Sequence, residues 1–321
     1  MIYKKISVIL LSTIALSACA KGTTEAKTSH TAAEITDPAL KQQVQQLLDK
    51  TKKELIFVKG GHYMMGDFGP ETLDSKLPYD SQADSKPSHK VTLTDFSLSA
   101  TKATYADFDI FTAATNRPKV GVFDKYSIHE RIPTVAAGIN WQQARDYCQW
   151  LGQQLNLNMD LPTEAQWEYA ARNRGQNILY PTNNGQVDVG KNVWSYDQRR
   201  DIRKKYKSIS EVPELKQFPP TPLGFYDMIT DNYEWMLDWY DPEYYAKSPD
   251  LNPQGPSTGT LKVVRSSAPN NGDSLKMWAG FTFSRMRMHP VADPERANSA
   301  SVKKYNIDLN QKNSVRCAVN H

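Results

Sequence analysis

Few side chains in this sequence are placed to do chemistry. Glu164 and Glu168 lie four residues apart, so a helix would carry both carboxylates on one face, as an acid–base pair or a metal site requires. Such a pair more often bonds backbone or cationic groups that hold long loops in place, and we favour that interpretation. No Ser–His–Asp order, phosphate-binding loop or dinucleotide fingerprint is recognisable.

The histidines predict no metal centre. They form no pair at helical or hairpin spacing, and none is paired with a nearby carboxylate as in a facial triad. A soft-metal site of His289 with Met286 and Met288 is one alternative, but a histidine satisfied in the core or at the surface is the simpler interpretation. The six are His30, His62, His89, His129, His289 and His321.

The start of the chain predicts export and lipidation. Two lysines precede an apolar run at residues 6–16, which is too short to span a bilayer as a mature helix. The run closes in a Leu-Ser-Ala-Cys sequence that resembles a bacterial lipobox, so residues 1–18 are predicted to be a signal peptide and Cys19 the lipidated residue. An ordinary signal peptide with an incidental cysteine is the alternative. Ala20, rather than Asp, implies an outer-membrane anchor that faces the periplasm.

Two segments follow the predicted anchor. Residues 19–36 are rich in Thr, Ala, Lys and Ser without an apolar period, which predicts a flexible tether. Residues 37–53 predict a helix, because Asp37-Pro38 offers an N-cap and a first-turn proline and apolar residues follow at helical spacing. We expect this helix to pack on the main domain; a partner-binding helix is the alternative.

The elements that would position the polar groups are short. A short apolar run predicts a strand at 55–58, and alternating apolar residues predict one at 89–93. Helical spacing predicts helices at 105–114, 141–155 and 163–172. The last two helices begin at residues that can cap them. After residue 175 the chain reads as mostly loop.

Composition excludes several classes of protein. The 321 residues carry 39 Lys+Arg against 35 Asp+Glu, so a net charge of +4 gives no reason to propose nucleic acid as a partner. An apolar fraction of 39% excludes a disordered chain. The basic stretch 198–216 is read as a solvated surface insertion, with a contact for an acidic partner as the alternative.

Several separated segments together resemble the formylglycine-generating enzyme (sulfatase-modifying factor) family. The most specific is Leu161–Arg172, with the sequence LPTEAQWEYAAR. The resemblance implies an α+β domain over residues 54–321, related to C-type lectin folds and low in regular secondary structure. The other matching segments are Phe57–Gly66, His89–Phe96, Ile132–Val135, Asn140–Trp150, Leu223–Met228 with Glu234-Trp235 and Asp238–Tyr240, and Ser314–Ala318.

The resemblance also implies structural calcium and a disulfide. One calcium site would use the side chains of Asp227 and Glu234 and the carbonyls of Thr230 and Asn232, because calcium prefers oxygen ligands. A second would begin near Asn192 and Val193. Ordinary side-chain bonding within loops is the alternative for both. Cys148 and Cys317 lie where the family has a structural disulfide, and two buried free thiols are the alternative.

The chemistry of the active enzymes is missing from the sequence. Active members of the family oxidise a substrate cysteine with two cysteines that bind copper, and thiolates are the ligands that Cu(I) selects. No cysteine occurs between residues 149 and 316, so no copper is expected. The resemblance therefore implies a non-catalytic relative, not an enzyme.

Binding is the function that this pattern favours. We expect a lipoprotein that binds a protein partner in the cell envelope, as an accessory or assembly component of a machine such as a type VI secretion system. A periplasmic metal-dependent oxidase or maturation enzyme is one rival, and an envelope spacer is another. The expected partner surface is the degenerate active-site region, comprising Arg265, Ser266, Asn270, Asn271, Arg285, Arg287 and His289.

Overall fold

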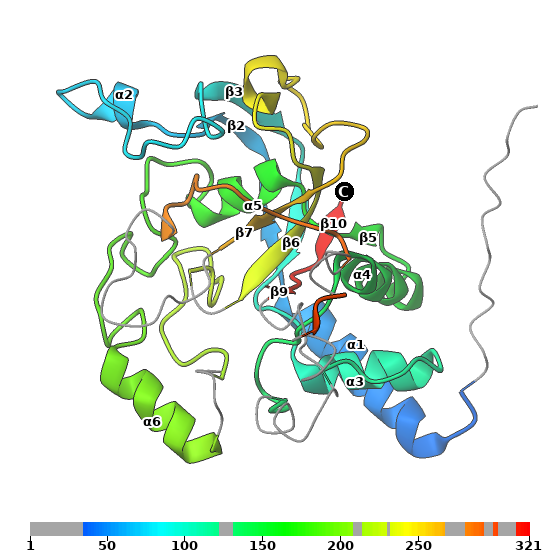
Figure 1. Ribbon diagram of the computed structural model, residues 1–321. Helices are drawn as coiled ribbons and strands as arrows, with labels where there is room; N and C mark the ends of the chain where they lie inside the picture. The colour runs from blue at the N-terminus through cyan, green and yellow to red at the C-terminus, as the bar shows by residue number, and fades with distance from the viewer. Residues whose placement is uncertain are drawn as a thin grey trace, which may run out of the picture. The chain divides into compact units, whose positions relative to one another are not determined.

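Helix α1 (Pro38–Glu54) opens the part of the chain that the computed structural model describes. That part comprises residues 35–121, 131–207, 214–229, 232–266, 280–291, 298–300 and 313–321. The Asp37 side chain caps α1 by accepting from the amide of Ala39 at 2.9 Å, and the helix expected at 37–53 is confirmed to within one residue. Its apolar face packs mainly on α3 (Tyr105–Ala114) and also on α4 (Trp141–Leu155) (Figure 1).

Both α3 and α4 have the boundaries expected from the sequence. Each begins with a capping box, in which the N-cap side chain and the side chain three residues later bond each other's backbone amides. Aromatic side chains fill the space between the two helices, where Phe111 lies 5.5 Å from Tyr147 and 5.4 Å from Trp150 between ring centroids. Burial of this apolar surface holds the helical layer together.

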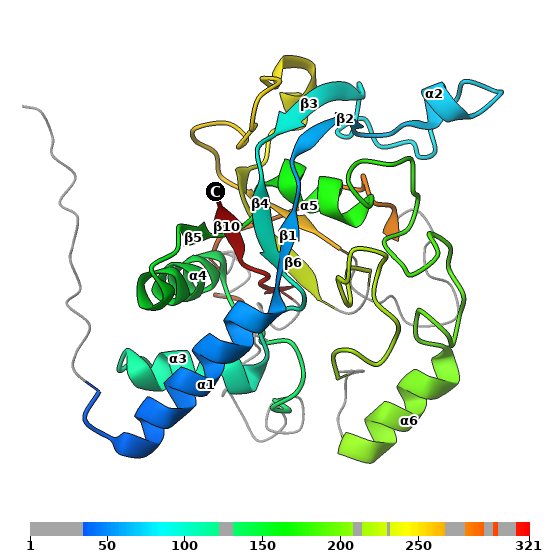
Figure 2. The same ribbon diagram turned by 180° about the vertical axis from the view of Figure 1, so that it is seen from behind.

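An antiparallel sheet forms the centre of the molecule. Its strand order is β1 (Leu55–Val58), β4 (Phe96–Ser99), β10 (Ala318–Asn320) and β5 (Met159–Asp160), so the last strand of the chain inserts between segments from its first half (Figure 2). Because β10 follows Cys317 directly, the sheet also places the C-terminal cysteine beside the helical layer.

Two further sheets complete the fold. Strands β2 (Gly61–Met65) and β3 (His89–Leu93) form an antiparallel pair, and a third sheet has the order β8 (Met286–Met288), β7 (Lys262–Arg265), β6 (Tyr233–Trp239) and β9 (Asn313–Ser314). Helix α5 (Glu164–Ala171) contacts strands of both sheets, and all eight of its residues are buried. The carboxylates of α5 therefore lie inside the protein.

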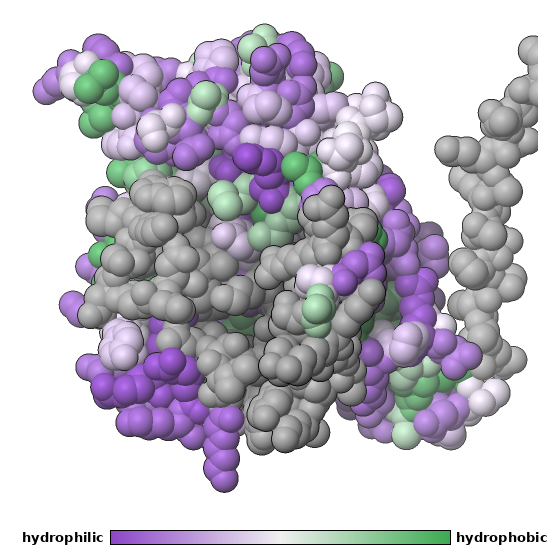
Figure 3. Space-filling model, in the orientation of Figure 1, coloured by the Kyte–Doolittle hydropathy of each residue, from purple (hydrophilic) through white to green (hydrophobic). Residues whose placement is uncertain are grey.

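The remaining elements are small. In the described part of the chain they are α2 (Gly69–Thr72), a 3-10 helix at Tyr244–Lys247 and the basic helix α6 (Tyr196–Tyr206). Only Arg199 of α6 is buried, and its surface is strongly hydrophilic (Figure 3). Short strands and few helices confirm the expected α+β class with little regular secondary structure. Among the described residues, no helix has the length and apolar character needed to cross a membrane.

Candidate functional site

The two glutamates of α5 bind arginines inside the protein. Glu164 accepts from Arg285 Nε at 2.8 Å and from Arg265 Nη1 at 3.0 Å. Glu168 accepts from Arg265 Nη2 at 2.7 Å and from Arg172 Nη1 at 3.0 Å. Arginine forks match carboxylates in such paired bonds. This confirms the interpretation that the pair holds loops in place.

The prediction of an exposed partner surface is wrong for three of its residues. Arg265, Ser266 and Arg285 are only 0%, 7% and 5% exposed. The physical reason is that the buried α5 carboxylates draw the two guanidinium groups inward, because an unpaired buried charge is very costly. Asn270 and Asn271 lie outside the residues that the structure describes.

The outer part of this region is formed by β8. Arg287 and His289 are exposed, and Arg287 donates from Nη1 to the hydroxyl of Tyr240 at 3.1 Å, with its guanidinium 5.0 Å from that ring. Met286 and Met288 are half-buried against the larger apolar cluster. Since neighbouring strand residues face opposite sides, the methionines are committed to packing, and the soft-metal alternative with His289 is not supported.

Unpartnered polar atoms lie beside the buried charges. Tyr245 Oη, His89 Nε2 and Ser85 Oγ are buried and have no hydrogen-bond partner in the described part of the chain. The rings of His89 and Tyr245 are 4.6 Å apart, and the guanidinium of Arg285 lies 4.3 Å from the Tyr245 ring. Burial lowers the pKa of His89 and raises the pKa of Tyr245 well above its usual value. Both groups are therefore held neutral, and bound water is their ordinary partner.

Asp238 is the acidic group most perturbed in this region. Its Oδ2 accepts from the backbone amide of Glu164 at 2.8 Å, at the start of α5. Burial, followed by the charge of Glu164, raises the pKa of Asp238 to about 7. The perturbed pKa of Asp238 was not predicted from the sequence, because the proximity of β6 to the start of α5 is a tertiary contact.

The first expected calcium site is already occupied by cations of the chain. Glu234 is fully buried and accepts from Arg316 at 3.0 and 3.1 Å, with Lys102 Nζ 3.5 Å away. The Asp227 carboxylate accepts from the backbone amide of Lys216 at 2.9 Å. Thr230 lies outside the described residues, while Asn232 is buried. The Glu234 carboxylate does not fit calcium, because Arg316 and Lys102 already neutralise its charge.

At the second expected calcium site, the polar groups of the loop form hydrogen bonds with one another. Asn192 is buried, its Oδ1 accepts from the amide of Asp188 at 2.7 Å, and its Nδ2 donates to Gln186 O at 3.0 Å. The carbonyl of Val193 accepts from the amide of Gly190 at 2.7 Å. Ordinary side-chain bonding, the alternative stated for this loop, describes these contacts.

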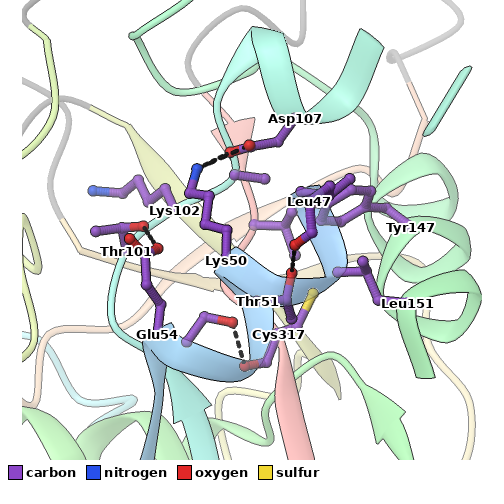
Figure 4. Close-up of a pocket in the computed structure, with 13 residues that line it drawn as sticks. Leu47, Lys50, Thr51, Glu54, Thr101, Lys102, Asp107, Tyr147, Leu151 and Cys317 are labelled. Atoms are coloured by element: carbon purple, nitrogen blue, oxygen red, sulfur yellow. Dashed lines mark hydrogen bonds and ion pairs between the residues drawn. The ribbon is translucent and has the colours of Figure 1, made fainter. Parts of the chain in front are cut away.

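The expected disulfide is confirmed. Cys148 and Cys317 are bonded, with their Cα atoms 5.4 Å apart and a sequence separation of 169. Beside Cys317 lies a cavity of about 30 Å³, which the Lys50–Asp107 ion pair borders (Figure 4). This volume suits water rather than a substrate. Within the described ranges, no cluster of three histidine, cysteine or acidic side chains is arranged to hold a metal ion.

Comparison with known proteins decides the family. Residues 41–317 match the sulfatase-modifying factor enzyme 1-like domain. This chain belongs to the formylglycine-generating enzyme family. The formylglycine-generating enzyme of Streptomyces coelicolor is 32% identical over 130 residues, which are 40% of this chain and 39% of that protein. The mouse enzyme is 25% identical over 259 residues, covering 66% of this chain and 65% of that protein.

The chain is also similar to proteins with other names. The serine/threonine-protein kinase pkn1 of Chlamydia pneumoniae is 26% identical over 66% of this chain, which spans 32% of that kinase. The solved structure of PvdO from Pseudomonas aeruginosa matches with a TM-score of 0.58 at 20% identity, over 83% of this chain and 94% of that one. Treponema denticola variable protein 1 matches with a TM-score of 0.53 at 17% identity, over 83% of this chain and 94% of that one. These two likenesses show the formylglycine-generating enzyme fold.

Proposed function

We propose that this chain is a non-catalytic member of the formylglycine-generating enzyme family that binds a protein partner in the cell envelope. One observation carries the proposal. The sequence has three cysteines, and two of them, Cys148 and Cys317, are joined to each other in the core. Only Cys19 remains, so the chain has no pair of thiolates to bind Cu(I) in the manner of the active enzymes.

The names of relatives are consistent with such a role. The bovine protein named inactive C-alpha-formylglycine-generating enzyme 2 is 29% identical over 116 residues, which are 36% of that protein. A member of the family can therefore carry the fold without the activity. The lipobox-like sequence ending at Cys19 supports a lipid anchor, and we place the domain on the periplasmic side of the outer membrane. An accessory role in a machine such as a type VI secretion system is part of the same proposal.

The exposed face of β8 is the contact surface that we propose. Arg287 presents its guanidinium over the Tyr240 ring, and His289 follows on the same side of the strand. Arginine and tyrosine are favoured at the centres of protein interfaces. The neighbouring Arg285 is fixed by Glu164, so this surface is held in one conformation before a partner arrives.

An oxygen-consumption assay tests the absence of catalysis. The purified protein is loaded with Cu(I), or separately with Fe(II), and mixed with a cysteine-containing peptide. We expect no oxygen uptake above the protein-free blank and no oxidised peptide by mass spectrometry. Turnover with either metal would overturn the proposal in favour of a metal-dependent oxidase.

Charge reversal tests the contact surface. Arg287→Glu is expected to abolish cross-linking to envelope proteins in cells, while the melting temperature stays within about 1 °C because the side chain is exposed. Lys204→Glu on α6 is the matched control and should leave the cross-links intact. If Lys204→Glu removes them and Arg287→Glu does not, the basic helix is the contact surface and the β8 proposal is wrong.

A further inference from the structure

Lys102 is a lysine inside the protein, between β4 and the start of α3. Its side chain is 0% exposed, although lysine is among the residues least often buried without a partner. Backbone bonds fix its neighbours on both sides, because Ala100 O accepts from the amide of Tyr226 and the amide of Ala103 donates to Val315 O, each at 2.9 Å. The position of the Lys102 backbone is therefore set by the fold.

The ammonium group of Lys102 contacts two residues of the segment from 227 to 234. Lys102 Nζ donates to the carbonyl of Asp227 and lies 3.5 Å from Oε1 of Glu234. Its side chain starts at the wall of the small cavity under α1 and ends away from the cavity (Figure 4). An ammonium is a compact charge with three donors, so it can bond a carbonyl and a carboxylate at the same time.

Glu234 is surrounded by cations and donors. Besides Lys102, the carboxylate accepts two bonds from Arg316 and one from Trp167 Nε1 at 2.8 Å. Although burial opposes ionisation, Arg316 and then Lys102 lower the pKa of Glu234. An ionised carboxylate beside two fixed cations leaves no negative charge for a divalent ion, which both cations would repel.

We propose that the Lys102 ammonium takes the place of a structural divalent cation between Asp227 and Glu234. It links Asp227 to Glu234, which a calcium ion bound to both carboxylates would also do, although the ammonium bonds the backbone carbonyl of Asp227 rather than its carboxylate. Arg316 strengthens the link, because it also donates to the carbonyl of Tyr226 at 2.8 Å. This segment therefore needs no metal for its stability.

Calcium addition and removal test the proposal directly. The wild-type protein is melted in excess EDTA and in excess calcium chloride, and calcium binding is measured by titration calorimetry. We expect the two melting temperatures to agree within about 1 °C and no calorimetric binding at this segment. A stoichiometric calcium ion that survives desalting, or a melting temperature raised by calcium, would overturn the proposal.

Substitution tests whether Lys102 carries the link. Lys102→Met keeps the length of the side chain and removes its charge, so we expect the melting temperature to fall by at least about 5 °C. Lys50→Met is the control: Lys50 also pairs with an aspartate, but its side chain is 39% exposed, and a shift of at most about 2 °C is expected. Equal stability of the wild type and Lys102→Met would contradict the assignment.

A double substitution separates a charge effect from a packing effect. Glu234→Gln leaves two buried cations without their anion, so in that background Lys102→Met should be neutral or stabilising. An equal loss in both backgrounds would show that Lys102 acts by packing. If Glu234→Gln fails to fold, the calcium experiments on the wild type still decide the proposal.

Discussion

At the scale of the residue, the interior of this protein is organised by charge. The carboxylates of Glu164 and Glu168 fix Arg265, the last residue of β7, and Arg285, which directly precedes β8; both arginines are far away in the sequence. A buried ion pair contributes little net stability compared with an apolar pair, but loss of one partner leaves a charge that is very costly. Substitutions in this cluster should therefore damage folding rather than partner binding.

Asp238, next to Glu164, gives a pH prediction. Because burial raises its pKa to about 7, the folded protein holds a proton on Asp238 that the unfolded chain releases above a pKa of about 3.9. Asp238 therefore makes the free energy of unfolding decrease as the pH rises from about 4 to about 7, with no further decrease above that. We expect Asp238→Asn, which is neutral at every pH, to reduce this slope and to be more stable than the wild type at pH 8.

Urea unfolding at several pH values measures this effect. Asp49→Asn, which changes an exposed carboxylate on α1, is the control and should keep the wild-type slope. A slope that is unchanged in Asp238→Asn would contradict the expected protonation of the buried group.

At the scale of the element, helix starts are fixed by local bonds. Asn140, Thr163 and Ser195 each form a capping box at the first turn of α4, α5 and α6. In α5 the Thr163 hydroxyl accepts from the amide of Gln166 at 3.2 Å, and Gln166 Oε1 accepts from the amide of Thr163 at 3.0 Å. The same local chemistry has different consequences, because α5 is buried and α6 is not.

Removal of the α5 cap tests this difference. Thr163→Ala should lower the free energy of unfolding by about 1–2 kcal/mol, because it leaves a buried amide without its acceptor. Ser195→Ala removes the same cap from exposed α6 and should cost less, since α6 buries only Arg199. Chemical denaturation of the two variants compares them, and equal losses would show that burial of α5 is irrelevant.

At the scale of the whole molecule, the C-terminal end of the domain is tied to segments from the first half of the chain. Cys148 on α4 bonds Cys317, which precedes β10, and β10 pairs with both β4 and β5. A covalent bond and strand pairing therefore hold the C-terminal segment in the same region of the fold. The link limits the freedom of the unfolded chain more than it changes the folded one.

Removal of the disulfide should be severely destabilising. For a loop of this length, chain entropy predicts a loss of at most about 5 kcal/mol when both cysteines are replaced by alanine. Thermal unfolding with and without dithiothreitol measures the loss, and the reductant should have no effect on the doubly substituted protein. A wild type whose melting temperature is the same with the bond fully reduced would contradict this expectation.

Local patterns in the sequence predicted the elements well. The boundaries of α3 and α4 and of β1 and β3 follow from apolar spacing and from capping residues, because these depend on neighbours a few residues away. The disulfide and the family came from resemblance, and the structure contains the first while the match to residues 41–317 shows the second. The predicted exposure was wrong for Arg265 and Arg285, whose carboxylate partners are distant in the sequence.

The sequence alone determined the lack of a thiolate pair and, through its resemblance to known proteins, the family and the class of the fold, because these depend on residue types and their order along the chain. Only the tertiary structure decided that Arg265 and Arg285 point inward to α5, that Arg287 stays at the surface, and that Glu234 is held by Lys102 and Arg316. The physical reason is that the direction of a charged side chain depends on which opposite charge the fold brings close, and that proximity exists only after the chain has packed.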